Sequence, residues 1–228
     1  MSSFSTLIFD LDDTLIQTTA YLIEPALHRV YNEGVKKRLP ISWEEFLKAR
    51  HDFESQPQSQ NFFRYVIEYY RQQEEPDDGQ TAQQWRRMFN TFFCADKTHL
   101  WPGAHELLSS LQKKYTLYLV TAGDPKTQEM KIQHTKISPY FQQIFFVNVM
   151  MNETKDTILR LITVIEAHEA QKFLVIGDRL DKEIRAGQKL GLSTCHMHVH
   201  EYGKYQSPDL RPDFIVKSLQ DFTRVCKL

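Results

Sequence analysis

Ile8-Phe9-Asp10-Leu11-Asp12-Asp13-Thr14-Leu15 sets three carboxylates directly after a short apolar run. The run Leu7–Phe9 is too short for a helix and has the composition of a buried strand, so we expect a strand that ends at Asp10. Open α/β sheets bind their ligands at the carboxyl ends of their strands. Crowded carboxylates repel one another unless a cation is present, and a hard ion such as Mg²⁺ prefers their oxygens. The alternative is an acidic loop that only caps the strand.

Similar apolar runs recur along the chain and predict further buried strands. They are Leu117–Val120, Ile144–Val147, Phe173–Ile176 and Phe214–Val216. Helical spacing lies between them, as in Ile158, Leu161, Ile162 and Ile165. Strands that alternate with helices imply right-handed crossovers, so the sequence predicts an α/β protein with a doubly wound parallel sheet.

Residues 17–97 break this alternation and contain helical stripes instead. The stripes are Ile23, Ala26, Leu27, Val30 and Tyr31; Trp43–Phe53; Phe62, Phe63, Val66, Ile67 and Tyr70; and Trp85, Met88, Phe89, Phe92 and Phe93. Turns are expected at Pro57-Gln58-Ser59 and Pro76-Asp77-Asp78-Gly79. We therefore expect a core of residues 1–16 and 98–228 with an all-helical domain inserted at 17–97. The aromatic rings could stack on a nucleotide, but their helical spacing favours a packed core.

Three further elements could complete a site around the first strand. One predicted strand ends in Thr121-Ala122-Gly123-Asp124, where a hydroxyl and exposed amides could hold phosphoryl oxygens. Lys155 stands at the start of a predicted helix, where its ammonium would balance carboxylates and a bound phosphate. The strand Phe173–Ile176 leads into Gly177-Asp178, a second buried strand that ends in an acid.

In chain order, these segments resemble the motifs of the haloacid dehalogenase (HAD) superfamily. Phe9–Leu15 matches the first motif, hydrophobic-Asp-x-Asp-x-Thr, while Thr121, Lys155 and Gly177-Asp178 match the second, third and fourth. The helical insertion stands where the C1 cap of phosphoglycolate phosphatase-like members stands. The resemblance covers about two-thirds of the chain, and it implies a Rossmann-like core, a helical cap and a Mg²⁺-dependent phosphoric monoester hydrolase.

The resemblance also implies the catalytic roles. Asp10 would attack phosphorus and form an aspartyl phosphate, and Asp12 would protonate the leaving alcohol and then activate water. Thr121 and Lys155 complete the catalytic set, and the phosphate would be held by Asp10, Thr121, Ala122 and Lys155. The presence of Asp12 argues against a dehalogenase, because related dehalogenases lack this carboxylate.

For Mg²⁺, the resemblance implies three ligands: one oxygen of Asp10, the backbone carbonyl of Asp12, and Asp178. Glu183 stands where many relatives have Asp, and we expect it to reach the metal through the metal's water shell. We expect Asp181 to cap the amides of the following helix. A second departure from the family pattern is Asp156, where many members of this subgroup have Pro.

Composition limits the partners and the compartment. The 228 residues are 41% hydrophobic and 25% charged with a net charge of −1, so we expect neither nucleic acid nor a membrane as a partner. The N-terminus lacks the features of a signal peptide, and three widely spaced cysteines fit reduced thiols, so we expect a cytoplasmic protein. The expected partner is a small phosphate ester. A monomer and a homodimer stay equally open.

Rival functions share parts of the pattern. A phosphotransferase or phosphomutase would use the same four motifs, and a catalytically silent member would use the fold as a binding protein. A receiver-type signalling domain also groups acids, Thr and Lys, but it is half this length and lacks the insertion. Cys195–His200 alternates three imidazoles, His196, His198 and His200, which we interpret as the polar face of an edge strand rather than a transition-metal site.

Overall fold

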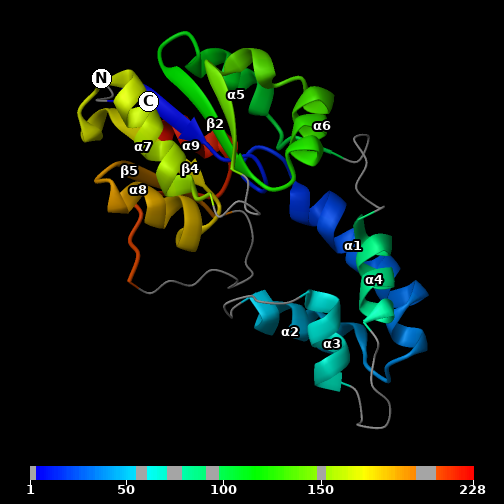
Figure 1. The fold of residues 1–228 in the computed structure, drawn as a ribbon. Helices are drawn as coiled ribbons and strands as arrows, with labels where there is room; N and C mark the ends of the chain where they lie inside the picture. Colours follow the sequence, from blue (N-terminus) through cyan, green and yellow to red (C-terminus); the bar gives the residue numbers. More distant parts are fainter. Residues whose placement is uncertain (1–3, 55–60, 71–78, 91–97, 148–152, 199–208) are drawn as a thin grey trace. The chain divides into compact units, whose positions relative to one another are not determined.

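The computed structural model describes residues 4–54, 61–70, 79–90, 98–147, 153–198 and 209–228. The chain divides into two compact units (Figure 1). One contains residues 1–18 and 98–228, and the other contains residues 19–97. Each unit has its own hydrophobic core, so each is described by itself.

The first unit is built on a six-stranded sheet in the order β3-β2-β1-β4-β5-β6, and every pairing is parallel. The strands are β1 (Thr6–Phe9), β2 (Thr116–Ala122), β3 (Gln143–Val147), β4 (Phe173–Gly177), β5 (Ser193–Met197) and β6 (Phe214–Val216). The strand order reverses between β1 and β4, which is where open parallel sheets place their ligands. The predicted doubly wound α/β fold is confirmed.

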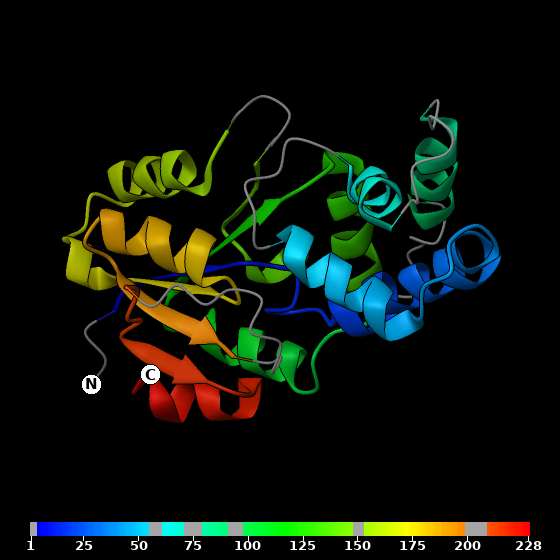
Figure 2. The ribbon, with the colours of Figure 1, turned by 90° about the horizontal axis from the view of Figure 1, so that it is seen from below.

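Helices cover both faces of this sheet (Figure 2). Alternate residues of β1 face opposite sides, so Leu7 and Phe9 join one core and Ile8 joins the other. The first core contains α5 (Ala104–Leu111), α6 (Pro125–Thr135) and α9 (Leu219–Val225), and the second contains α7 (Lys155–Glu166) and α8 (Arg185–Lys189). Short turns of helix at η4 (Ser138–Tyr140), η6 (Ala170–Lys172) and η7 (Leu180–Ile184) complete the connections.

The fifth strand corrects one expectation from the sequence. β5 lies between β4 and β6, so the interpretation of Cys195–His200 as an edge strand is wrong. His196 is buried, and its Nε2 lies 2.9 Å from the backbone carbonyl oxygen of Asp178, the distance of an N–H donating to that oxygen. His198 is exposed, and His200 lies outside the described residues. The ring of His196 therefore supports the loop after β4 instead of forming a polar outer face.

The secondary structure of the second unit is all helical in its described residues, and short irregular segments join some of the helices. It contains η1 (Thr19–Ile23), α1 (Glu24–Glu33), η2 (Val35–Lys37), α2 (Trp43–Glu54), α3 (Phe62–Tyr70) and α4 (Gln80–Asn90). Rings at helical spacing fill its core, with Phe46, Phe62, Phe63 and Trp85 all buried. A Cβ on Gly34, which directly follows α1, would lie 2.5 Å from Nε1 of Trp85 on α4. Only glycine therefore lets the end of α1 pack this closely against α4. Phe92, Phe93 and most of both expected turns lie outside the described residues.

The two segments that flank the helical unit meet inside the first unit. Ile16 pairs with Leu100 in an antiparallel bridge, and the Gln17 N–H donates to the His99 carbonyl at 2.8 Å. The chain therefore leaves the α/β unit and returns to it at neighbouring points. In the described residues, no helix has the length and apolar character needed to cross a membrane.

Candidate active site

Three carboxylates converge at the carboxyl ends of β1 and β4. Asp10 directly follows β1, and its N–H donates to the Ile176 carbonyl of β4 at 2.9 Å. Asp178 directly follows β4, and Glu183 comes from the turn η7 just beyond it. One carboxylate oxygen from each of these three acids lies within 4.8 Å of the other two. The sequence named all three residues, and the structure brings them together.

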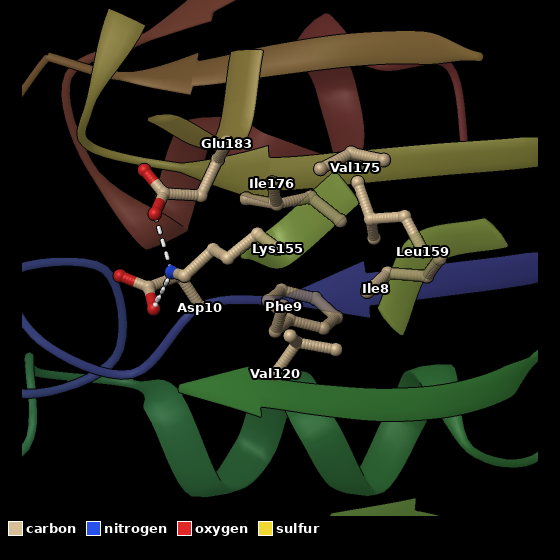
Figure 3. A pocket seen from close by; sticks show the side chains of 9 residues that line it. All are labelled: Ile8, Phe9, Asp10, Val120, Lys155, Leu159, Val175, Ile176 and Glu183. Atoms are coloured by element: carbon tan, nitrogen blue, oxygen red, sulfur yellow. Dashed lines mark hydrogen bonds and ion pairs between the residues drawn. The ribbon is translucent and has the colours of Figure 1, made fainter. Parts of the chain in front are cut away.

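Lys155 lies between two of these acids (Figure 3). It is the first residue of α7 and is buried. Its Nζ donates to Oδ1 of Asp10 at 2.5 Å and to Oε1 of Glu183. Burial alone would lower the pKa of Lys155, but the charges and hydrogen bonds of Asp10 and Glu183 outweigh burial and raise it. The ammonium is therefore charged at neutral pH.

One ammonium does not neutralise three acids. Burial raises the pKa of Asp10 to about 7, aided by repulsion from Glu183 and Asp12, while Lys155 pulls it down. The pKa of Asp178 is raised well above its usual value, first by burial and then by Glu183 and Asp10. The three acids and one ammonium leave the cluster short of positive charge, and the atoms that could bind a metal are hard carboxylate oxygens. These residues fit Mg²⁺, which neutralises such clusters and prefers oxygen ligands.

Gly177 makes room for Glu183. A Cβ on Gly177 would lie 2.4 Å from Cγ of Glu183, closer than any two such carbons can approach. The Glu183 side chain therefore crosses directly over the glycine. Its Oε2 accepts the N–H of Arg179 at 3.1 Å, which fixes the second oxygen. The Gly177-Asp178 pair at the end of β4 thus has two functions: Asp178 supplies one acid, and Gly177 leaves space for the second, Glu183.

The carboxylate of Asp12 is held by a different group of side chains, which comes from α6. Its Oδ1 lies 2.7 Å from Nζ of Lys131, and its Oδ2 accepts from Nε2 of Gln128 at 2.7 Å. The hydroxyl of Thr18 also donates to Oδ1. Burial works to raise the pKa of Asp12, but the charge of Lys131 and these hydrogen bonds hold it below its usual value. The side chain is therefore ionised while no ester is bound, and the backbone carbonyl is the Asp12 group that we expect at the metal.

Thr121 lies at the end of β2 and is fully buried. Its Oγ1 accepts from Nε2 of Gln128 at 2.6 Å, so its own O–H proton can still be donated. Ala122 is the last residue of β2, and its carbonyl lies 3.1 Å from the same Gln128 nitrogen. Gly123 has φ of 144°, a conformation that favours glycine, and it starts the turn into α6.

Lys131 and Gln128 were missed from the sequence. Both lie on α6, three residues apart, so they share one face of that helix. The only available signal was that two polar residues occupy positions on the buried face of the helix that follows the Thr121-Ala122-Gly123-Asp124 segment. Periodicity alone does not separate such a polar pair from a solvated helix face, which explains the omission.

Asp156 and Asp181 both have local partners. Asp156 lies in the first turn of α7, where a carboxylate is favourable, and it pairs with Lys189 at 3.0 Å. Asp181 lies in the first turn of η7, where its carboxylate has a backbone hydrogen bond at its own amide. Its two oxygens also accept from the Arg179 guanidinium at 2.9 and 2.8 Å.

A small cavity lies behind Lys155 (Figure 3). It has a volume of about 10 Å³ and is lined by Asp10, Lys155, Glu183 and six apolar residues, namely Ile8, Phe9, Val120, Leu159, Val175 and Ile176. A cavity of this size holds one water molecule at most. This cavity forms the mostly apolar floor of the site, and it is too small to bind a phosphate ester.

Comparison with known proteins shows which family this arrangement represents. A sequence model of the "Haloacid dehalogenase-like hydrolase" family matches residues 7–197. The HAD-hydrolase YfnB of Bacillus subtilis is 25% identical over 247 residues, which cover 100% of this chain and 97% of that protein. The pyrimidine 5'-nucleotidase PynA of Streptococcus pneumoniae is 29% identical over 133 residues, covering 57% of this chain and 55% of that protein.

A further relative and a solved structure extend the comparison. The glyceraldehyde 3-phosphate phosphatase of Pyrococcus abyssi is 25% identical over 204 residues, covering 87% of this chain and 82% of that protein. The crystal structure of YfnB bound to magnesium superposes with a TM-score of 0.70 at 24% identity, and 99% of each chain is covered. At this identity the structural likeness shows a shared fold.

Proposed function

The chain belongs to the haloacid dehalogenase-like hydrolase family, and we propose that it is a magnesium-dependent phosphatase that acts through a phosphorylated Asp10. Its enzyme class, a phosphoric monoester hydrolase, agrees with relatives named as phosphatases and nucleotidases. One observation carries the proposal. Asp10, Asp178 and Glu183 lie within 4.8 Å of one another with Lys155 against two of them, which leaves a site for a hard cation beside a nucleophile.

The metal would be held by Asp10, the Asp12 backbone carbonyl and Asp178, with Glu183 acting through the metal's water shell. When bound, Mg²⁺ would neutralise phosphoryl charge and keep Asp10 ionised. The chain's own residues do the remaining work. Lys155 and the Thr121 hydroxyl hold phosphoryl oxygens, together with the amide of Ala122, and they stabilise the charge that spreads over these oxygens during transfer.

The reaction proceeds in two balanced steps. A carboxylate oxygen of Asp10 forms a bond to phosphorus as the bond from phosphorus to the ester oxygen breaks. Asp12, which takes up a proton when the anionic ester binds beside it, gives that oxygen its proton. A water oxygen then attacks the phosphorus of the aspartyl phosphate while Asp12 takes the water proton. The bond to Asp10 breaks, and its electron pair returns to the carboxylate. The net reaction converts one ester and one water into an alcohol and phosphate.

We further propose that the helical unit acts as the cap, with residues 17–97 forming a domain that excludes bulk water and selects the ester. Its separate core supports an independent role, since such a unit keeps its shape while it moves. A small-molecule substrate is supported by the relatives' names, which include a nucleotidase and a triose-phosphate phosphatase. A cytoplasmic setting is supported by Cys195 and Cys226, two buried thiols that stand 3.5 Å apart and are unbridged.

The direct test is release of phosphate from a panel of monoesters by the purified protein with Mg²⁺. The panel includes nucleoside monophosphates, triose phosphates, phosphoglycolate and p-nitrophenyl phosphate. Asp10→Asn should fold and release none, and beryllium fluoride should inhibit the wild type by occupying the place of the phosphoryl group. A wild type that is inactive across the panel would identify a silent binding protein. Transfer to an added sugar in place of water would identify a phosphotransferase.

A further inference from the structure

We propose that Lys131 and Gln128 are positioning residues for the acid/base carboxylate Asp12, and that Gln128 couples this carboxylate to the phosphate-holding Thr121. The inference rests on the proposed phosphatase function and adds two residues that act on the proton-transfer step. Neither residue touches the Asp10, Asp178 and Glu183 cluster in the contacts that the structure describes.

The two oxygens of Asp12 are held separately. Lys131 holds Oδ1 at 2.7 Å, together with the hydroxyl of Thr18, and Gln128 holds Oδ2 at 2.7 Å. A carboxylate gripped at one oxygen can still turn about its terminal bond, whereas a carboxylate gripped at both has a fixed plane. That plane decides which lone pair points toward the ester oxygen. Proton transfer needs the two heavy atoms at hydrogen-bonding distance and in line, so the grip sets the geometry of catalysis.

The holding groups are themselves rigid. Lys131 and Gln128 are both nearly fully buried, so neither side chain is free to sample other positions. Their helix is fixed at its start by Asp124, whose carboxylate accepts the Thr127 N–H at 2.9 Å. Gly123 lies against the Gln128 side chain, at ordinary contact distance for a Cβ placed there. Burying a lysine destabilises the fold unless a carboxylate pairs with it, so the buried Lys131 is consistent with a role in holding Asp12.

Gln128 does more than support one residue. Its single amide nitrogen lies 2.7 Å from Asp12, 2.6 Å from the Thr121 hydroxyl and 3.1 Å from the Ala122 carbonyl. It therefore joins the end of β2 to the loop after β1. Because the Thr121 oxygen accepts from Gln128, the Thr121 proton stays available for another acceptor, which in the proposed reaction is a phosphoryl oxygen. The acid/base group and the phosphate-holding group are thus set by one side chain.

The leaving group separates this role from a purely structural one. An alkoxide must receive a proton as it departs, while p-nitrophenolate leaves readily without one. General acid catalysis typically contributes about 10²–10⁴-fold, and a misplacement of about 1 Å can cost about 10²-fold. A badly placed Asp12 should therefore slow the first step for an alkyl ester much more than for p-nitrophenyl phosphate.

The experiment measures kcat/KM for p-nitrophenyl phosphate and for the best alkyl phosphate of the panel, at saturating Mg²⁺. Lys131→Met should lower kcat/KM about 100-fold for the alkyl ester and less than about 10-fold for p-nitrophenyl phosphate. Lys131→Arg, which retains the charge, should recover most of the loss. Gln128→Leu should give the same pattern and provides a second variant should Lys131→Met not fold.

Matched controls come from the exposed side of the same helix. Lys126→Met and Gln133→Leu remove the same groups from positions that face solvent, and they should leave both rates unchanged. In an Asp12→Asn background, Lys131→Met should have no further effect on either ester, because the group it positions is gone. Circular dichroism verifies the fold of each variant.

Each outcome bears on one idea. Equal losses on both esters, or an undiminished effect of Lys131→Met in the Asp12→Asn background, would overturn the positioning role and leave a structural ion pair. Wild-type protein that hydrolyses neither ester would reject the phosphatase proposal and, with it, this inference. Active wild type with an unchanged ester ratio in Lys131→Met and Gln128→Leu rejects the positioning role alone.

Discussion

The metal-free protein should become less stable as the pH rises, and Asp10 is one cause, beside Asp178, whose pKa is also raised by burial. Burial, with repulsion from Glu183 and Asp12, raises the pKa of the Asp10 carboxyl from 3.8 to about 7 in the folded chain. Between these two values the folded state keeps a proton that the unfolded state has lost. The stabilising contribution is therefore complete below 3.8 and is lost as the pH rises through 7.

The magnitude follows from the difference between the two pKa values. Each pH unit over which the folded and unfolded states differ by one proton changes the free energy of unfolding by about 1.4 kcal/mol. Between pH 5 and pH 8 this gives a loss of about 3 kcal/mol for Asp10. In a domain of this size, 1 kcal/mol moves Tm by about 2–4 °C, so the expected fall is about 6–12 °C.

The assay compares wild type with Asp10→Asn in EDTA by thermal unfolding at pH 5, 6, 7 and 8. Asparagine carries no charge, so the variant should be the more stable protein at pH 8, and its advantage should shrink toward pH 5. Taking the difference cancels other groups that titrate here, such as His196, whose burial lowers its pKa and opposes the trend below pH 6.5. Saturating Mg²⁺ should stabilise the wild type most at pH 8, since metal binding requires ionised carboxylates.

Two results would refute this reasoning. One is a difference in Tm between Asp10→Asn and wild type that stays constant from pH 5 to pH 8. The other is a wild type in EDTA that is already the more stable protein at pH 8. Either would mean that the carboxylate cluster is neutralised without a metal.

Three further changes test separate parts of the structure. Gly177→Ala should displace Glu183, whose Cγ lies 2.4 Å from the added Cβ, and should raise the Mg²⁺ concentration needed for half-maximal activity by about 10–100-fold; an unchanged Mg²⁺ titration would count against the role of Glu183. Asp178→Ala should abolish activity at every Mg²⁺ concentration, and recovery with excess metal would show that Asp178 is not a direct ligand. Gly34→Ala should destabilise the helical unit by about 1–3 kcal/mol through overpacking on Trp85, with no effect on the Mg²⁺ titration; calorimetry that shows an unchanged unfolding profile would contradict it.

Much of the α/β unit was predictable because its signals are local. Short apolar runs predicted β1 to β4 and β6 within a few residues, since a strand covered on both faces must be apolar throughout. The acids of Asp10 and Asp178 stood directly after such runs, so the position of the site followed from the fold rule for parallel sheets. The helical stripes of α1 to α4 were equally visible, because each buries one face of its helix.

The errors arise where the outcome depends on neighbours that are distant in sequence. β5, which contains His196, was interpreted as an edge strand, but β6 pairs with its outer side. The ring of His196 contacts the carbonyl oxygen of Asp178 instead of facing outward. Asp181 has the sequence signature of a cap, and the sequence did not predict that both of its oxygens also accept from the guanidinium of Arg179, two residues before it. The contact of Lys131 with Asp12 joins residues 119 positions apart, and neither composition nor periodicity encodes such a pair.

The antiparallel bridge between Ile16 and Leu100 has a consequence for how such an enzyme diversifies. Two chain segments that run side by side can be joined by two residues or by eighty, because the entropy of closing a loop rises only with the logarithm of its length. A gene could therefore gain, lose or exchange everything between Thr18 and Thr98 without shifting the register of any strand. A hairpin turn spliced at this point should leave the sheet intact, and a foreign helical domain grafted there should bring its own selectivity. If the inserted unit selects the ester as proposed, the bridge lets substrate selection change without any change to the catalytic sheet.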